Sequence, residues 1–348
     1  MSPFAKLLAA FCLLPLACLP AAAAPPDRLG DKAEIVLHPT DPLPPPGPKW
    51  ALAIHGGAGT ISKDLPEAEK QEYIQALTKA LTLGKEMLAK GATSLDTVEA
   101  VVRSLEDDPH FNAGKGAVFT HDGTNELDAA IMDGRTLSCG SVAGLKRIKN
   151  PVSLARLVME KSPHVFMVGE GAEAFAAERK VEMVDPKYFF TQKRYDQWQE
   201  ELKKEREKEK AAKDHDTVGA VAFDQQGNLA AATSTGGLTN KRFGRLSDVP
   251  VIGAGTYANN RTCAVSATGI GEEFIKHTVA HDISALMEYG GLSLQQAADK
   301  VIHQKLQPGD GGVIGVAHDG SIALVFNSEG MYRGAADSNG RFDVAIWE

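Results

Sequence analysis

A highly charged segment that gives way abruptly to small apolar residues is the feature that most constrains the fold of this chain. Residues 193–210 carry 13 charged side chains in 18 positions. Such a run cannot bury one face, so it predicts either a solvated helix or a mobile loop. At Thr217 the chain changes to TVGAVAFD, which is small, apolar and compatible with a β-strand. The sequence therefore predicts a charged mobile linker, at about 190–216, that leads directly into a buried sheet.

The rest of the chain predicts sheets with helices outside them. Strands are expected at 50–57, 217–224, 229–237 and 263–269, with a hairpin within 311–330 around Asp319 and Gly320. Helices are expected at 65–90, 94–107, 151–161, 271–289 and 293–306. Ser94 is a candidate N-cap and Pro151 a candidate first-turn residue. Strands on both sides of a helical block are typical of layered sheets.

The N-terminus has the pattern of a secretory signal. Lys6 precedes an apolar run from Leu7 to Leu19, and a string of alanines follows. The run is too short to be a stable membrane span. We therefore expect a signal peptide at 1–23, a proline-rich extended segment at 24–49, and a mature protein that is exported, to the periplasm, without a membrane anchor.

Two alternatives for this end stay open, namely a buried N-terminal helix and a lipid anchor at Cys18. After removal of the leader, Cys139 and Cys263 remain. Two cysteines do not form a disulfide framework, and they either pair or stay free. The formal net charge of −8 argues against nucleic acid as the main partner.

Thr217 is the first candidate for chemistry. A threonine hydroxyl is a poor nucleophile unless a base lies beside it. If the chain is cut between Asp216 and Thr217, the new α-amino group, with an unperturbed pKa of about 7.7–8.0, becomes that base. The charged linker then has a purpose, because its end must leave the site. The alternative is that Thr217 is an ordinary β-branched strand residue.

Other glycine- and threonine-rich clusters supply possible partners for such a nucleophile. In SATGIGEE, the Thr268 hydroxyl and the Gly269 N–H precede a predicted helix and could stabilise an oxyanion, although a phosphate site or a turn would look similar. Arg245 and Asp248 could hold the carboxylate and the ammonium of an amino acid, or form a surface ion pair. The histidines lack the spacing of a catalytic zinc site.

HDTVGAVA at 215–222 and the motifs around it resemble the plant-type asparaginase and isoaspartyl peptidase family of N-terminal-nucleophile hydrolases. The match runs from about Trp50 to Phe326 and includes, in the family's order, HGGAG, FNAGKGAVF, ELDAAIMDG, TSTGGLTNKRFGRLSD, GAGTYANN and SATGIGE. The resemblance implies an α+β fold, a four-layer αββα sandwich. It also implies a precursor that cleaves itself into an α subunit ending at 216, whose part of the hydrolase domain is 50–216, and a β subunit at 217–348.

The resemblance assigns roles to residues at matching positions. Thr217 would be the nucleophile, Thr235 would orient it, and Asn112 would help to place it. Arg245 would bind the substrate α-carboxylate, Asp248 its α-ammonium, and Thr268 with Gly269 would form the oxyanion hole, with Gly271 beside that pocket. No cofactor is expected for catalysis. The backbone carbonyls of Leu105, Glu106, Phe111 and Ala113 would hold a structural sodium ion.

The function expected from these assignments is that of an isoaspartyl peptidase with L-asparaginase activity. Its partners would be small-molecule substrates, with no nucleic acid and no membrane, and two αβ units would pair. Two rivals remain, namely an aspartylglucosaminidase-like hydrolase of glycosylasparagine and, from another class, an uncleaved amino-acid-binding protein.

Overall fold

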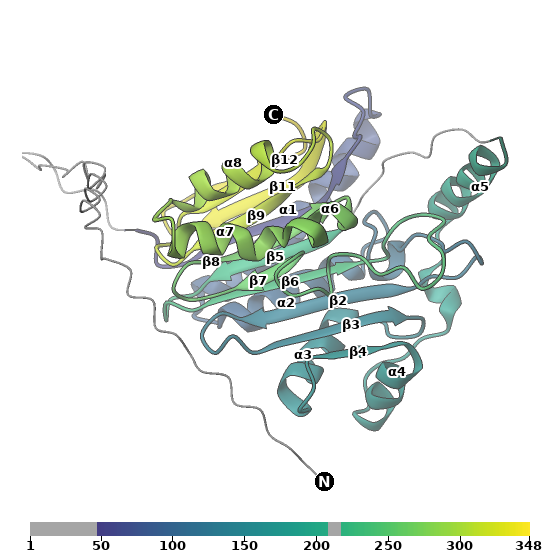
Figure 1. Ribbon diagram of the computed structural model, residues 1–348, viewed down its shortest axis with the longest axis horizontal. Coiled ribbons are helices and arrows are strands. Elements are labelled where there is room, and N and C mark those ends of the chain that lie inside the picture. Colours follow the sequence, from purple (N-terminus) through teal and green to yellow (C-terminus); the bar gives the residue numbers. More distant parts are fainter. Residues whose placement is uncertain (1–46, 208–216) are drawn as a thin grey trace, which may run out of the picture. The chain divides into compact units, whose positions relative to one another are not determined.

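The computed structural model describes residues 47–207 and 217–348. The expected signal peptide, residues 24–46 of the proline-rich segment, the end of the linker and Asp216 lie outside this part of the chain. The described residues form two sheets and the helices that cover them (Figure 1).

The larger sheet has eight strands in the described chain, in the order β12-β11-β1-β5-β6-β2-β3-β4. Their bounds are β1 Ala51–Gly59, β2 Leu127–Asp133, β3 Cys139–Leu145, β4 Phe166–Val168, β5 Val218–Phe223, β6 Leu229–Thr235, β11 Gly330–Asp337 and β12 Phe342–Ala345. Neighbours are antiparallel, except that β4 lies parallel to β3. The run of apolar residues after Thr217 becomes the central strand β5, buried between β1 and β6.

The smaller sheet packs on one face of the larger one. Its order is β10-β9-β8-β7, with bounds of Ile322–Phe326, Gly311–Ala317, Cys263–Gly269 and Thr256–Ala258. Most side chains in the core between the sheets are small or medium in size, such as Ala53, Val221, Ala231, Ile314 and Val316, although Met132, Phe326 and Met331 also belong to it. Alanine at these positions allows the two sheets to approach closely.

Helices cover both outer faces. The larger sheet carries α1 (Glu67–Ala89), α2 (Ser94–Glu106) and α3 (Pro151–Lys161), and the smaller one carries α6 (Gly271–His277), α7 (Val279–Glu288) and α8 (Leu294–Gln304). The predicted four-layer αββα sandwich is confirmed (Figure 1). No helix in the described residues is both long and apolar enough to cross a bilayer.

Local details differ from the prediction at two helix ends. The predicted helix 271–289 is two helices, because Thr278 takes a left-handed conformation with φ +46° between α6 and α7. The N-cap of α2 is Thr93, whose side chain accepts from the N–H of Asp96, and Ser94 is the first helical residue. The N–H of Ser94 donates instead to buried Asp224. Pro151 does occupy the first turn of α3.

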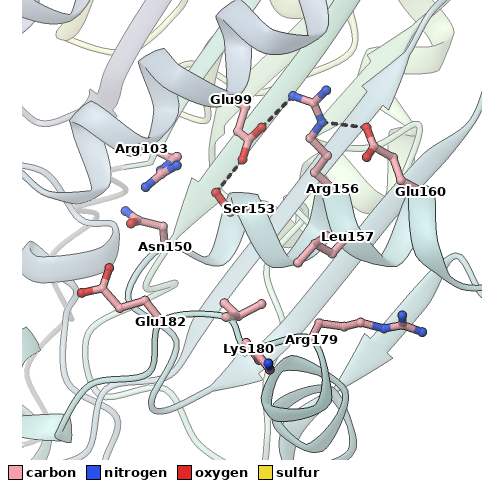
Figure 2. A pocket seen from close by; sticks show the side chains of 11 residues that line it. Glu99, Arg103, Asn150, Ser153, Arg156, Leu157, Glu160, Arg179, Lys180 and Glu182 are labelled. Carbon is pink, nitrogen blue, oxygen red and sulfur yellow. Dashed lines mark hydrogen bonds and ion pairs between the residues drawn. The ribbon is translucent and has the colours of Figure 1, made fainter.

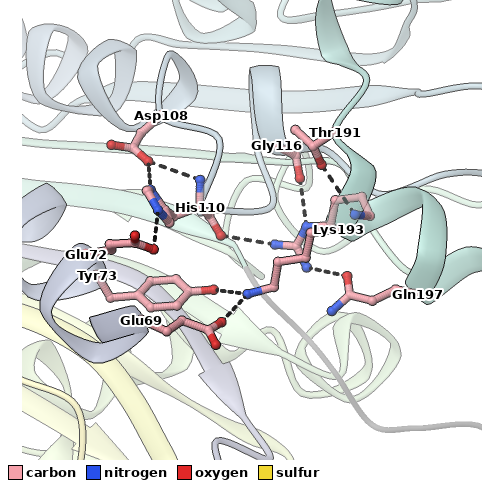
Figure 3. Close-up of polar contacts among 10 residues, drawn as sticks. Glu69, Glu72, Tyr73, Asp108, His110, Gly116, Thr191, Lys193 and Gln197 are labelled. Atoms are coloured by element: carbon pink, nitrogen blue, oxygen red, sulfur yellow. Dashed lines mark hydrogen bonds and ion pairs between the residues drawn. The ribbon is translucent and has the colours of Figure 1, made fainter. Parts of the chain in front are cut away.

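Over its described residues, the segment predicted as a charged mobile linker at about 190–216 instead forms helix α5 (Gln192–Glu207), which is the solvated-helix alternative. Polar contacts anchor it (Figure 3). Its one buried side chain, Arg194, donates from Nε to the Gly116 carbonyl at 2.9 Å, and the neighbouring Lys193 donates to the Tyr73 hydroxyl at 2.9 Å. Short elements α4 (Gly169–Glu178), η1 (Gly114–Gly116) and η2 (Pro186–Phe189) complete this region. Cys139 and Cys263 are free.

Candidate active site

The predicted nucleophile lies at the start of the central strand β5. Thr217 is buried, and its hydroxyl donates to the Thr235 hydroxyl across 3.2 Å. The two residues meet because β5 and β6 are antiparallel, with Val218 opposite Ser234. The Thr235 oxygen also accepts from the Gly237 N–H at 3.0 Å. The structure thus brings together Thr217 and the residue expected to orient it.

Asn112 supports the turn that follows Thr235. Its side-chain amide donates to the Gly237 carbonyl at 2.7 Å, and its backbone carbonyl accepts from the Gly236 N–H at 3.0 Å. Its side-chain oxygen accepts from the Val118 N–H. These contacts place Asn112 behind the Thr235–Gly237 turn, from where it fixes the partner of Thr217.

Arg245 and Asp248 lie on the loop after β6, which we call the substrate loop (residues 238–248). Asp248 is buried, and its Oδ2 has no hydrogen-bond partner among the described residues. Burial raises the pKa of Asp248 to about 7, although the Arg245 guanidinium acts in the opposite direction. A buried carboxylate oxygen without a partner is costly, so this atom favours a cationic ligand.

Arg245 does not form the surface ion pair with Asp248 that was one alternative. Its Nε and Nη2 donate to both carboxylate oxygens of Glu272 at 2.9 Å each. This parallel pair of bonds fixes the plane of the guanidinium. Glu272, the second residue of α6, therefore belongs to the site, and the sequence analysis assigned it no role.

Gly271 lies where the two charged side chains converge. A Cβ added to Gly271 would stand 2.8 Å from Arg245 Nη2 and 2.9 Å from Asp248 Oδ1. A Cβ on Gly237 would stand 3.4 Å from Arg245 Nη1. The cation and the carboxylate thus converge beside the turn that supports Thr235, with glycines leaving room between them.

Thr268 and Gly269 end strand β8. Thr268 is fully buried, and its hydroxyl oxygen accepts from the Ala58 N–H at 3.2 Å. Gly269 has a φ of +155°, and a Cβ there would clash with the Asp310 carbonyl, so glycine is required. Thr268 shares a face of β8 with Ser266, whose hydroxyl contacts the site from the smaller sheet, as described next.

His55, in the HGGAG cluster, is a site residue to which the sequence analysis gave no role. Its Nδ1 lies 3.0 Å from the Thr217 carbonyl oxygen, and its Nε2 lies 2.8 Å from the Ser266 hydroxyl. Burial lowers the pKa of His55 to about 3, so the imidazole is neutral. Only the pairing of β1 with β5, which puts His55 opposite Gly219, reveals this contact.

The substrate loop is held from two sides. Asp128 on β2 accepts from the N–H of Ser247 at 3.1 Å and from its hydroxyl at 2.9 Å. From α5, Glu205 accepts from Arg242 at 2.6 Å and from the Asn240 side chain at 3.1 Å. Both contacts restrict the loop that carries Arg245 and Asp248.

The carbonyl groups expected to hold a sodium ion lie at the end of α2 and in the loop that follows it. The Leu105 and Ala113 carbonyls each accept one backbone hydrogen bond, from Asp108 and Gly116, which leaves each a second lone pair. The Glu106 and Phe111 carbonyl oxygens lie against Gly114 and Gly116, where a side chain would clash with them. A set of carbonyl oxygens fits a hard cation. Within the described residues, no group of three or more His, Cys, Asp or Glu side chains is placed to hold a metal.

A cavity of about 400 Å³ lies elsewhere, beside α2 and α3 (Figure 2). Arg156 in its wall donates to Glu99 at 2.7 Å and to Glu160 at 2.8 Å, and Ser153 also donates to Glu99. The carboxylates of Glu99 and Glu160 are thus already paired. The predicted site residues do not line this cavity.

A four-layer αββα sandwich with a hydroxyl side chain at the head of a central strand is the architecture of the N-terminal-nucleophile hydrolases. The chain belongs to one family of this class, because the family model described as "Asparaginase" matches residues 48–346.

Relatives match most of the chain. An Escherichia coli protein named "Isoaspartyl peptidase" is 52% identical over 299 residues, which is 82% of this chain and 92% of the relative. An Arabidopsis thaliana protein named "Probable isoaspartyl peptidase/L-asparaginase 2" is 44% identical, over 86% of this chain and 99% of its own length. A human protein named "Isoaspartyl peptidase/L-asparaginase" is 42% identical, over 82% and 92%.

Proposed function

We propose that this chain is a precursor that cleaves itself before Thr217 and then hydrolyses β-aspartyl amide bonds, as an isoaspartyl peptidase with L-asparaginase activity. The names of the relatives support the substrate class. The observation that carries the proposal is the hydrogen bond from the Thr217 hydroxyl to Thr235 at the head of the central strand. That bond positions the one side chain that both steps of the chemistry require.

In self-cleavage, the Thr217 hydroxyl oxygen attacks the carbonyl carbon of Asp216. The C–N bond breaks, the nitrogen takes up the hydroxyl proton, and an ester links the two residues. Water then hydrolyses the ester, which leaves a carboxylate on Asp216 and restores the hydroxyl of Thr217. The α-amino group released when the C–N bond breaks is the base that the hydroxyl lacked before.

In turnover, the free amine of Thr217 takes the hydroxyl proton while the oxygen attacks the side-chain amide of asparagine or an isoaspartyl bond. The hydroxyl of Thr268 and the N–H of Gly269 would stabilise the oxyanion. Because the Thr268 oxygen accepts from Ala58, its own proton can point elsewhere. The leaving ammonia or amine takes a proton from the Thr217 ammonium, and water hydrolyses the acyl-enzyme to release aspartate.

Substrate recognition would use the two charged groups that converge on Gly271. Arg245, already fixed by Glu272, has donors left for the α-carboxylate of the substrate. Asp248 would accept from the α-ammonium through its carboxylate, whose Oδ1 lies toward Gly271 and whose Oδ2 has no hydrogen-bond partner among the described residues. The substrate must therefore carry a free α-ammonium and a free α-carboxylate, as an amino acid such as asparagine or an isoaspartyl dipeptide does.

The proposal also covers localisation, assembly and a bound ion. The leader pattern supports export to the periplasm, and two αβ units would pair. A sodium ion with a structural effect only would be held by the carbonyls of Leu105, Glu106, Phe111 and Ala113. N-terminal sequencing of protein from the periplasmic fraction tests export, and the mass in solution tests the pairing. A change in melting temperature when sodium replaces a bulky organic cation tests the ion.

The deciding experiment combines a denaturing gel, intact mass and hydrolysis assays. We expect two fragments that meet at 216/217, and release of aspartate from asparagine and β-Asp-Leu. Thr217→Ala should stay uncut and inactive, and hydrolysis that survives in this variant would refute the nucleophile. Activity confined to glycosylasparagine would support the aspartylglucosaminidase-like rival. A single uncut band that binds amino acids would support the binding protein.

A further inference from the structure

The contact between His55 and the Thr217 carbonyl has no part in the reaction just described. His55 lies on β1 and is fully buried between the two sheets. It reaches the nucleophilic residue through the backbone, with Nδ1 at 3.0 Å from the carbonyl oxygen of Thr217.

The hydrogen-bond partners fix the tautomer of His55. A carbonyl oxygen only accepts, so Nδ1 must carry the proton and donate it to Thr217. Nε2 is then an acceptor, and the Ser266 hydroxyl at 2.8 Å donates to it. The pKa of about 3 that burial gives His55 keeps this arrangement neutral throughout the range in which the enzyme would work.

The network continues through further buried hydroxyls. The Ser266 oxygen lies 2.7 Å from Thr233 Oγ1, which in turn lies 2.8 Å from Thr256 Oγ1. Since Ser266 gives its proton to His55, Thr233 donates to Ser266. The Thr256 hydroxyl has two acceptors within reach, Thr233 Oγ1 and the Val249 carbonyl oxygen at 3.1 Å. All members are buried, and they come from β1, β6, β7 and β8. Buried hydrogen bonds thus link strands of both sheets, and the donors from Thr233 through Ser266 and His55 run in one direction to the carbonyl of Thr217.

Gly219 shows that the sheet is built around this network. Gly219 pairs with His55 in the register of β1 and β5. A Cβ at this position would clash with both Ser266 Oγ and His55 Nε2. The central strand therefore leaves out a side chain where the imidazole and the hydroxyl meet.

We infer that His55 is a positioning residue, which acts by fixing the peptide group between Thr217 and Val218. The inference rests on the proposed function. Cleavage before Thr217 removes the covalent tether on its amino side. Within the described residues, Thr217 is then held by the bond to Val218, the carbonyl contact with His55 and the hydroxyl contact with Thr235. His55 fixes the peptide plane and the place of the Thr217 Cα. Thr235 then holds the hydroxyl oxygen, whose position depends on rotation about the Cα–C and Cα–Cβ bonds.

Loss of the His55 donor would let that plane tilt and carry the hydroxyl and the amine with it. A displacement of about 1 Å at a reacting group can lower the rate by about 100-fold. The substrate contacts of Arg245 and Asp248 lie on another loop and stay in place. The effect should therefore appear in kcat and in the rate of self-cleavage, while KM changes little.

The test uses the full chain with three substitutions. His55→Phe removes the donor, and His55→Asn retains a side-chain N–H near the position of Nδ1 while giving up the Ser266 contact. Thr256→Val is the matched control, because it removes a buried hydroxyl from the far end of the same network. For each variant, the half-time of cleavage, kcat and KM for β-Asp-Leu, and the melting temperature are measured.

We expect His55→Phe to lower kcat by about 10- to 100-fold with KM within about threefold of wild type, and His55→Asn to recover most of the loss. Thr256→Val should keep kcat near the wild-type value even if its melting temperature falls as much as that of His55→Phe. Equal kcat losses in His55→Phe and Thr256→Val at equal stability would overturn the inference, and so would wild-type kcat in His55→Phe.

A second variant keeps the test decisive if His55→Phe does not fold. Ser266→Ala leaves the imidazole without its donor on the Nε2 side, so His55 is less firmly held, and kcat should fall severalfold at constant KM. A wild-type kcat in Ser266→Ala would then overturn the inference. An inactive wild-type protein would instead refute the proposed function, so the two failures are distinguishable.

Discussion

Substitution of Gly271 by alanine should separate self-cleavage from turnover. The added methyl group would lie 2.8 Å from Arg245 Nη2, 2.9 Å from Asp248 Oδ1 and 3.1 Å from the Asp248 backbone nitrogen. The guanidinium ends a flexible side chain, but it can retreat only if its paired bonds to Glu272 shift with it. The buried carboxyl and its backbone have less freedom. The methyl therefore occupies the space where a bound amino acid would meet both groups.

The size of the effect follows from the bonds that would be lost. A hydrogen bond to a charged group contributes about 1.5–3 kcal/mol. Loss of the ammonium contact alone should lower kcat/KM by about 10- to 100-fold, and loss of the carboxylate contact as well by about 10² to 10⁴-fold. Self-cleavage needs neither contact, because its carbonyl is supplied by Asp216 of the same chain.

The assay follows both reactions in one preparation, with cleavage on a denaturing gel and aspartate release from asparagine over a range of concentrations. Gly271→Ala should be cut at the wild-type rate and show a strongly raised KM. Gly171→Ala in α4 is the control, because a methyl there meets no atom within 4 Å. A wild-type KM in Gly271→Ala would show that the substrate does not lie between Arg245 and Asp248.

Three further predictions concern the same site. Since the pKa of Asp248 is about 7 and only its ionised form attracts an ammonium, KM for asparagine should fall as pH rises through 7, and a KM independent of pH would contradict this. Thr235→Val removes the acceptor for Thr217 and leaves the Gly237 N–H unpaired at a cost of about 1–3 kcal/mol, so cleavage and kcat should both drop, whereas Thr235→Ser should retain them. Glu205→Gln weakens the half-exposed ion pair with Arg242, which contributes at most about 1 kcal/mol. The KM for asparagine should therefore rise by no more than about fivefold. A tenfold rise would mean that α5 controls the substrate loop more strongly than we infer.

The sequence predicts the central strands well because their signal is local. The apolar runs of β5, β6 and β8 are buried on both faces, so composition alone marks them. The break between α6 and α7 at Thr278 is not marked by a glycine or proline in the sequence. The left-handed conformation of this threonine is seen only in the structure. The short strands β4 and β12 have few residues and carry little pattern.

Some residues of the candidate site are likewise marked by local motifs, and others are revealed only by the folded structure. Thr217, Thr235, Arg245 and Asp248 stand in recognisable motifs, and the structure places each of them on the elements or loops that meet at one end of the sheets. The contacts of His55 and Glu272 depend on partners more than 20 residues away in the chain, namely Ser266 and Arg245. No local pattern specifies such pairings, because strand register and helix placement decide them.

The order of strands in the larger sheet would keep the two products of a cut before Thr217 together. Strand β1 precedes the cut, yet it is hydrogen-bonded on both sides to strands that follow it, β11 and β5. Strand β2 likewise borders β6. Strands of the two resulting chains would alternate within one sheet. Neither chain could dissociate without breaking the backbone hydrogen bonds of several strand pairs. Hydrolysis at that point would create a new chain end while the body of the protein stays whole.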